Sequence, residues 1–337
     1  MMHIQIVLFD GFDLLDAIAP YEVFTAAAMY SNEEVTVEFV SAEGKRIVES
    51  GVNHVKLQAT GKLDLLHKGI ILVPGAAGSV DNDGPDSIPV KLKQASETEL
   101  SHLLKEAIKK PTIVLSTVCG GALILAMDGL LEGRHAVTHH MGMELLRATG
   151  AIPIHSRVVD DGNLVTAGGV TSGLDVALYL VERELGPRIA LAVEQLFEYE
   201  RRGTTWKAIG DMPKEIPQDH SPEQETKNLT SKLVHDEMNI DGKWNTTIST
   251  PIGKIVALID IVFKDGRIEG TAKQGEEIVP LENPVLEGNQ LKWILKVSKP
   301  MRLTLKFSVS VEGNKMYGEA KAGMLPASKL TGYRMTQ

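Results

Sequence analysis

Residues 112–127 read TIVLSTVCGGALILAM and contain the only cysteine of the chain, Cys119. The apolar run before Cys119 predicts a buried β-strand, and the run after Gly120 and Gly121 predicts a helix. A strand that turns into a helix through glycines holds its turn residue at the carboxyl end of a sheet, as a nucleophile elbow does. The N–H groups and positive dipole end of that helix favour a thiolate. The stretch therefore predicts a nucleophilic cysteine, with a small buried apolar side chain as the simpler alternative.

The segments around this stretch alternate between strands and helices. Such alternation predicts βαβ units, which form a mostly parallel sheet with helices on both faces. Strands are expected at residues 4–9, 35–40, 69–74, 112–118, 136–138 and 164–167. Helices are expected at residues 20–29, 96–109, 122–127, 171–185 and 187–202.

The character of the chain changes after Trp206. Residues 211–226 are rich in Pro, Glu, Asp and Lys, which is typical of a linker. Residues 241–335 predict about seven or eight antiparallel strands separated by turns such as Asp265-Gly266, 287–289 and 312–314. We therefore expect an α/β domain at 1–208, a linker at 209–236 and a separate small all-β barrel or sandwich at 237–337.

Composition limits the class of protein. The chain has 337 residues, of which 43% are hydrophobic and 23% charged, and a net charge of −9. These values fit a globular protein and argue against a nucleic-acid partner or an anionic membrane surface. A single cysteine allows no internal disulfide and fits a reducing cytoplasm. The first nine residues predict a strand rather than a signal peptide, and no apolar run approaches the ~18 residues of a membrane span. We expect a cytoplasmic protein that acts on a small molecule.

A catalytic thiol needs an acid or base close by, and three side chains are candidates. Asp16 precedes the first predicted helix, Glu22 lies in its first turn, and His139 follows a short strand. Loops after parallel strands meet at the carboxyl edge of the sheet, where Cys119 is also expected. Each residue has a simpler explanation. Asp16 could cap a loop, Glu22 could complement the helix dipole, and His139 could be an ordinary rim histidine.

Backbone N–H groups could supply an oxyanion hole beside the thiol. Gly75 and Ala76 follow the strand at 69–74, and Gly120 follows Cys119. A plain turn is the alternative for residues 75–78. The two glycine-rich phosphate-binding motifs, G-x-x-x-x-G-K-[ST] and G-x-G-x-x-G, do not occur in the sequence. No spacing of His, Cys and Asp resembles a metal site. The sequence predicts no metal and no cofactor.

Several segments occur together in a fixed order that resembles the PfpI/ThiJ superfamily of class I glutamine-amidotransferase-like proteins. The resemblance covers roughly residues 3–205 and is greatest to the isonitrile hydratase branch; it extends to the sensor domains of AraC-type regulators. The segments are Gly11-Phe12, Leu15-Asp16, APYEVF at 19–24, Val73-Pro74-Gly75, VCGGA at 118–122, Thr138-His139 and AGGVTSGLD at 167–175.

The resemblance implies a flavodoxin-like three-layer α/β sandwich that forms a homodimer. It implies a nucleophile at Cys119, a carboxylic partner at Glu22, and an aspartate at Asp16 that handles water or a proton. His139 matches the superfamily histidine. The hydratase branch carries a threonine directly after the cysteine, where this chain has Gly120. The β-domain is an addition to the usual hydratase chain.

The sequence hypothesis is therefore an isonitrile hydratase-like enzyme. The Cys119 thiolate attacks the terminal carbon of an isocyanide, and Asp16 protonates the nitrogen of the resulting thioimidate. Asp16 then activates water, and an N-substituted formamide is released. Glu22, protonated and hydrogen-bonded to sulfur, holds the thiolate. Alternatives are a non-catalytic ligand-binding or sensor module, a glyoxalase-like or peptidase-like thiol activity, and redox sensing by Cys119.

Overall fold

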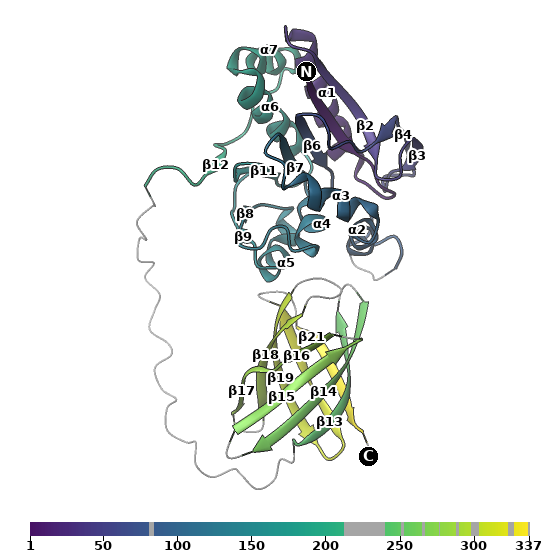
Figure 1. The fold of residues 1–337 in the computed structure, drawn as a ribbon, viewed down its shortest axis with the longest axis vertical. Coiled ribbons are helices and arrows are strands. Elements are labelled where there is room, and N and C mark those ends of the chain that lie inside the picture. The colour runs from purple at the N-terminus through teal and green to yellow at the C-terminus, as the bar shows by residue number, and fades with distance from the viewer. Residues whose placement is uncertain are drawn as a thin grey trace.

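The computed structural model describes residues 1–80, 84–211, 240–250, 253–264, 267–275, 277–287, 290–297, 303–322 and 327–335. These residues form an α/β domain followed by an antiparallel β-barrel domain (Figure 1). Most of the expected linker, residues 212–236, lies outside the described residues, as do the predicted turn at Asp265-Gly266 and residues 288–289.

The α/β domain is built on an eight-stranded sheet with the order β12-β10-β11-β7-β6-β1-β2-β5. The ladders between its described strands are parallel, apart from the antiparallel pair β10 and β11. The strands are β1 (Met2–Val7), β2 (Val35–Ser41), β5 (Gly61–Lys62), β6 (Gly69–Val73), β7 (Ile113–Thr117), β10 (Val158–Asp160), β11 (Leu164–Ala167) and β12 (Trp206–Lys207). Strand β6 is buried along its whole length, which is typical of a parallel strand covered on both faces.

Two short pairs complete the strands of this domain. Strands β3 (Arg46–Glu49) and β4 (Lys56–Ala59) are antiparallel, and β8 (His135–Ala136) and β9 (Ile152–Pro153) are parallel.

Two groups of helices cover the sheet and give the expected three layers. Helices α1 (Leu14–Tyr30), α6 (Ser172–Leu185) and α7 (Pro187–Phe197) pack against one another. Helix α4 (Gly121–Met127) packs against α2 (Ile88–Ser96), α3 (Glu99–Ala107) and α5 (Met143–Ala148), and a 3₁₀ turn at His140–Gly142 precedes α5. No helix in the described part of the chain has the length and apolar character needed to cross a membrane.

The first helix begins six residues before the expected start at Pro20. Asp13 is its N-cap, because its side chain accepts hydrogen bonds from the N–H groups of Leu15 and Asp16. Pro20 therefore lies inside α1 rather than at its first position. This shift places Asp16, and not Glu22, in the first turn of the helix.

The C-terminal domain is a nearly closed antiparallel barrel with the strand order β16-β15-β14-β13-β21-β20-β19-β18-β17. Its interior contains the fully buried side chains of Trp244, Trp293, Leu291 and Val309. The strands are β13 (Gly242–Thr250), β14 (Gly253–Lys264), β15 (Arg267–Gln274), β16 (Glu277–Pro280), β17 (Glu282–Glu287), β18 (Gln290–Val297), β19 (Leu303–Glu312), β20 (Lys315–Ala322) and β21 (Ser328–Arg334). The barrel alternative is confirmed over the sandwich, with more strands than the seven or eight expected.

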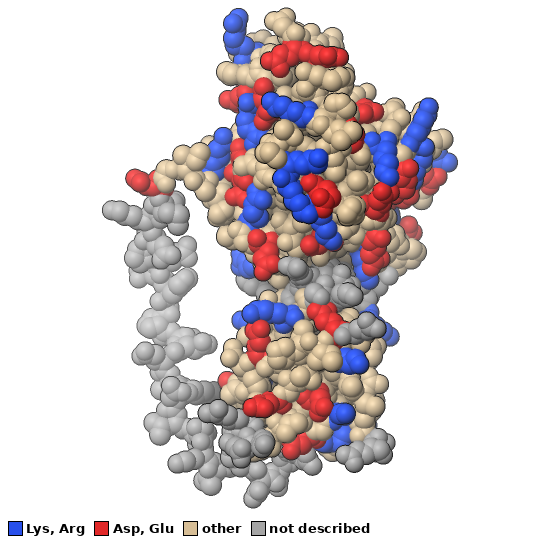
Figure 2. Space-filling view, viewed as in Figure 1, with Lys and Arg blue, Asp and Glu red and all other residues tan. Residues whose placement is uncertain are grey.

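Acidic and basic side chains are interspersed over the visible face of both domains, as Figure 2 shows. On this face, the described residues form no continuous basic surface of the kind that binds a nucleic-acid backbone.

Candidate active site

Cys119 lies on a sharp turn between β7 and α4, and its backbone is held from both sides. Its φ of +56° is in the left-handed region, which costs a non-glycine residue about 1–3 kcal/mol. Its N–H donates to the carbonyl oxygens of Ala167 and Gly168, at 3.1 and 2.9 Å. Its own carbonyl oxygen accepts a 2.7 Å hydrogen bond from Thr138 Oγ1. These contacts hold the cysteine at the carboxyl end of the sheet, which is the elbow geometry expected from the sequence.

Asp16 lies beside this thiol, fully buried in the first turn of α1. Its Oδ2 accepts a 2.9 Å hydrogen bond from the N–H of Gly75. A Cβ atom built on Gly75 would lie 2.9 Å from Asp16 Oδ2, 3.0 Å from Cys119 Cβ and 2.7 Å from the nitrogen of Gly120. Only glycine therefore leaves room for the carboxyl and the thiol to share this space.

The role expected for Gly75 changes as a result. The sequence predicted that its N–H would be an oxyanion donor, but this N–H holds the Asp16 carboxyl instead. The donors directed at the sulfur are the backbone N–H groups of Gly120 and Val170. Val170 has a φ of +31°, which is unusual for a β-branched residue.

Burial raises the pKa of the Cys119 thiol to about 12, and the negative charge of Asp16 adds to this effect. The N–H groups of Val170 and Gly120 lower the pKa, but their effect is smaller. The expectation of a thiolate favoured by the helix dipole is therefore wrong. Burial, followed by repulsion from Asp13, also raises the pKa of Asp16 well above its usual range, although hydrogen bonds from Gly75 and Cys119 oppose the shift. The structure therefore favours a neutral thiol at Cys119 and makes the Asp16 carboxylate more basic than that of an ordinary aspartate.

The other expected side chains differ in their placement. Glu22 is exposed on α1 and lies outside the set of described residues that line the cavity at Cys119. The structure therefore does not bring it to the sulfur. His139 does line this cavity, and its ring packs on that of His140 with centroids 4.2 Å apart. Burial, with a smaller contribution from His140, lowers the pKa of His139. Ala76 and Gly120 also line the cavity.

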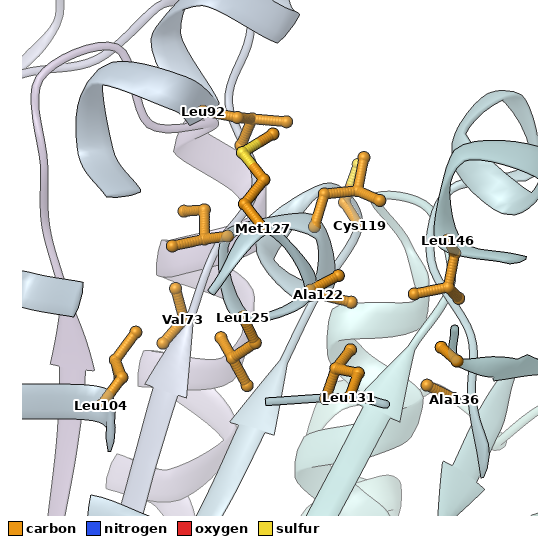
Figure 3. Close-up of a cluster of buried hydrophobic side chains, with 14 of the residues drawn as sticks. Val73, Leu92, Leu104, Cys119, Ala122, Leu125, Met127, Leu131, Ala136 and Leu146 are labelled. Carbon is orange, nitrogen blue, oxygen red and sulfur yellow. The ribbon is translucent and has the colours of Figure 1, made fainter. Parts of the chain in front are cut away.

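The cavity at Cys119 has a volume of about 500 Å³ and is mostly apolar. Figure 3 shows Cys119 among hydrophobic side chains that include Leu92, Met127 and Ala122. The barrel domain contributes a second part of the lining, from Ile248, Ile255, Leu305, Ala320 and Ala322. Helix α5 also contacts β19 and β20. A larger hollow of about 980 Å³, near Glu194 and Arg201, is separate from the thiol and has both polar and apolar side chains in its lining.

Sequence reasoning missed three contributors to this site. Thr138 was noted only as the neighbour of His139, and Val170 only as part of the stretch AGGVTSGLD. The signal for Val170 is its position between two glycines and Thr171-Ser172-Gly173, where the chain turns from β11 into α6. The barrel lining had no local signal, because those residues alternate as ordinary inward-facing strand positions.

The doubly wound α/β domain has a cysteine on a strand-to-helix elbow beside a buried carboxyl. These features define a class of thiol-bearing proteins with a small-molecule cavity. The sequence profile of the DJ-1/PfpI family matches residues 2–183. The chain belongs to the DJ-1/PfpI family. That match ends before the barrel domain begins.

Individual relatives agree with this assignment. Isonitrile hydratase from Pseudomonas putida is 33% identical over 198 residues, which is 59% of this chain and 78% of that protein. The HTH-type transcriptional regulator CdhR from Pseudomonas aeruginosa is 23% identical over 193 residues, or 57% of this chain and 53% of the regulator. The crystal structure of a ThiJ/PfpI family protein from Pseudomonas syringae matches with a TM-score of 0.50 and 24% identity, covering 60% of this chain and 76% of that one. This last similarity concerns the fold alone.

Proposed function

We propose that the protein hydrates an isocyanide to an N-substituted formamide, with Cys119 as nucleophile and Asp16 as acid and base. The observation that carries this proposal is the buried Asp16 carboxyl beside the thiol, inside a mostly apolar cavity. The similarity to the Pseudomonas putida isonitrile hydratase suggests the substrate class. An isocyanide is a neutral molecule with one electrophilic carbon, which suits an apolar cavity containing a thiol.

In the first step, the ionised Asp16 carboxylate accepts the thiol proton as sulfur bonds to the terminal carbon. A thiol with a pKa of about 12 needs such a base, and the raised pKa of Asp16 makes its carboxylate a stronger base than an ordinary aspartate. Asp16 then gives the proton to the same carbon. The carbon–nitrogen triple bond becomes a double bond, and the product is the thioimidate R–N=CH–S–Cys119. Carbon therefore receives this proton, which amends the initial expectation of nitrogen protonation.

In the second step, Asp16 takes a proton from water while the oxygen bonds to the thioimidate carbon. Asp16 then passes this proton to the nitrogen, which gives R–NH–CH(OH)–S–Cys119 and leaves Asp16 ionised again. The carbon–sulfur bond then breaks as the hydroxyl loses its proton, and Asp16 returns that proton to sulfur. The products are R–NH–CHO and the free thiol, so one water molecule is consumed. The Gly120 and Val170 N–H groups stabilise negative charge on sulfur as it leaves.

The remaining cavity residues have positioning roles in this scheme. His139, whose pKa is lowered, is a neutral hydrogen-bonding group at the cavity wall. Ala76 and Gly120 shape the wall close to sulfur. Gly120 replaces the threonine of the hydratase branch, and a Cβ atom built there would lie 3.0 Å from Leu92 Cδ1. Leu92 thus packs against the side of Gly120 that a threonine would occupy.

Turnover of an alkyl isocyanide tests the proposal directly. Formamide formation by the full-length protein is followed by proton NMR, with Cys119→Ala as the inactive variant and His102→Ala, an exposed change, as the matched control. We expect formamide from the wild type and the control at equal rates, and none above background from Cys119→Ala. Equal rates in all three proteins would refute a cysteine-dependent hydration.

The regulator relatives favour a second candidate, a ligand-binding sensor that keeps the cavity without the chemistry. A sensor would bind an apolar small molecule with the same affinity in the wild type and in Cys119→Ala, and would release it unchanged. Calorimetric titration with the isocyanide and with its formamide, followed by NMR of the recovered ligand, separates this candidate from the hydratase.

We also propose a homodimer, as the family resemblance implies. Helix α7 exposes Leu191 and Leu196, each more than half accessible, and such apolar side chains suit a subunit interface. Light scattering of the full-length protein would give twice the chain mass of 36.6 kDa, whereas a single-chain mass would contradict the dimer.

A further inference from the structure

We propose that His3, Asp64 and His67 form a binding site for a divalent transition-metal ion, with zinc as the preferred ion. The site lies at the amino end of the parallel sheet, whereas Cys119 lies at the carboxyl end. His3 is on β1, and Asp64 and His67 lie in the connection between β5 and β6. Sequence spacing predicted no metal site, because His3 is far from the other two residues along the chain.

The three side chains already direct potential ligand atoms toward one another. One ligand atom from each residue lies within 4.8 Å of the other two. His3 Nδ1 is 3.9 Å from Asp64 Oδ2, and His67 Nδ1 contacts the same carboxylate oxygen. Ligand atoms around a tetrahedral zinc ion with bonds of 2.0–2.1 Å are about 3.3 Å apart. Small side-chain rotations are therefore sufficient to admit an ion.

The partners of His3 leave its Nδ1 atom suited to metal binding. His3 Nε2 is 2.7 Å from Glu38 Oε1, and Glu38 Oε2 accepts a 2.7 Å hydrogen bond from Thr60 Oγ1. A proton on Nε2 satisfies Glu38 and leaves a lone pair on Nδ1, which faces Asp64. A lone pair and a carboxylate oxygen repel each other unless a proton or a metal ion lies between them, and a metal ion would also engage His67. A carboxylate that orients the far nitrogen of a metal-binding histidine is the usual outer-shell arrangement.

Asp64 is also held in place before any ion binds. Gln5, which is 2% exposed, donates a 2.7 Å hydrogen bond to the carbonyl oxygen of Asp64 and accepts one of 2.7 Å from its N–H. The N–H of Leu66 donates to Asp64 Oδ1 at 2.8 Å. This leaves Oδ2 directed at the two imidazoles. The backbone and side chain of Asp64 are thus preorganised as a ligand.

The donor set indicates which ion fits. Two imidazole nitrogens and one carboxylate oxygen suit zinc and its first-row neighbours, whereas magnesium and calcium prefer oxygen ligands throughout. The His67 side chain is about half exposed, so water can complete the coordination. An ion here would tie the β5–β6 connection to the first strand. Its main effect would be on stability rather than on the chemistry at Cys119.

Zinc titration of the chelator-treated full-length protein tests this site. We expect one zinc ion per chain by calorimetry, no comparable binding of magnesium, and a higher melting temperature with zinc. The variant His67→Asn, in an exposed position, is expected to weaken zinc binding at least tenfold. Glu38→Gln, which alters the outer shell, is expected to weaken it about 10–100-fold. His54→Asn is the matched control, because His54 is exposed and pairs with Glu49 instead.

A second measurement separates this site from the thiol. Zinc is also titrated into Cys119→Ala, which is expected to bind it as the wild type does. The proposal is overturned if the wild type binds no zinc, if His67→Asn binds zinc as tightly as the wild type, or if the binding disappears in Cys119→Ala. None of these three outcomes bears on isocyanide hydration.

Discussion

The protonation state of Cys119 determines what chemistry the site can perform. Two backbone N–H groups reach the sulfur, as the sequence suggested for a cysteine before a helix, but burial and the Asp16 charge outweigh them. The thiol is therefore neutral at physiological pH and needs an adjacent base to react. Asp16 is the buried carboxyl beside it, so the reactivity belongs to the pair rather than to the cysteine alone.

Alkylation of Cys119 by iodoacetamide should accelerate with pH without reaching a plateau below about pH 10. Only the thiolate reacts, and below a pKa of about 12 its fraction grows about tenfold with each pH unit. Replacing Asp16 by Asn removes a negative charge that raises this pKa, so at alkaline pH, where hydroxide can deprotonate the thiol without Asp16, alkylation of Asp16→Asn should be faster. Mass spectrometry of the intact chain measures both rates. A plateau near pH 7 in the wild type would show a thiolate and contradict the neutral thiol.

The position of Glu22 shows where residue-level reasoning from the sequence reached its limit. Pro20 suggested a helix start, which put Glu22 in the first turn, yet the Asp13 side chain begins the helix earlier. Asp16 and Glu22 are six residues apart, so they point to well-separated directions around the helix. Cys119 was predictable because a strand, a cysteine and two glycines carry a local signal. Which of the two nearby carboxylates lies in the first turn depends on the N-cap, where the Asp13 side chain accepts two backbone hydrogen bonds.

At the scale of elements, the site depends on the close approach of α4 to the end of β6. A Cβ atom built on Gly121 would lie 2.2 Å from the carbonyl oxygen of Val73 and 2.8 Å from that of Pro74. Gly121 therefore allows the first turn of α4 to rest on the strand. The same approach brings the Gly120 N–H to the sulfur. The contact between α4 and β6 therefore contributes both to the packing of the domain and to the position of a donor at the thiol.

The substitution Gly121→Ala should destabilise the protein by about 1–3 kcal/mol or more, because backbone atoms cannot move aside as a flexible side chain can. Gly173→Ala in α6 is the matched control: its Cβ would meet Pro20 at an ordinary 3.4 Å. We expect Gly173→Ala to unfold at the wild-type urea concentration or slightly above it. Equal unfolding midpoints for the two variants would contradict the close packing.

The elements differed in how well the sequence predicted them. The buried strands β1, β6, β7 and β11 were recognised because parallel strands are continuous apolar runs, whereas the short buried strand β10 was not predicted. The helix expected at 96–109 is α3, which begins at Glu99 because Thr98 is its N-cap, whereas helix α2 was not predicted. Strands β16, β17 and β21 were not among the predicted strands, and β16 and β17 follow each other with only Leu281 between them.

At the scale of the whole molecule, two domains share one cavity. The family match covers the α/β domain, while the barrel adds apolar side chains to the wall opposite Cys119. The spacing of hydrophobic residues predicts strands and helices within a domain, but it does not predict which surfaces of two domains face each other. The shared cavity could therefore not be predicted from the sequence. The barrel would therefore influence which substituents the cavity accepts, without touching the reacting atoms.

A larger side chain on the barrel side of the cavity should change which alkyl-chain lengths of the isocyanide substrate are accepted. Ala322 is buried and lines the cavity, so Ala322→Leu removes space there. We expect kcat/KM to fall at least several-fold for a long-chain alkyl isocyanide and to change little for a short one. Val262→Leu, at a half-exposed position on the same domain, is the control. Equal losses for short and long substrates would argue against a selective role for the barrel.

Comparison of Asp16→Asn with Glu22→Gln tests the central claim most directly. Each substitution replaces one carboxyl by an amide of the same shape, at two positions six residues apart on α1. Formamide production from an alkyl isocyanide is measured for both variants beside the wild type. We predict that Asp16→Asn loses at least a hundredfold in rate, as expected for loss of a general acid–base group, while Glu22→Gln retains the wild-type rate. A full rate in Asp16→Asn, or a comparable loss in Glu22→Gln, would contradict the assignment of Asp16.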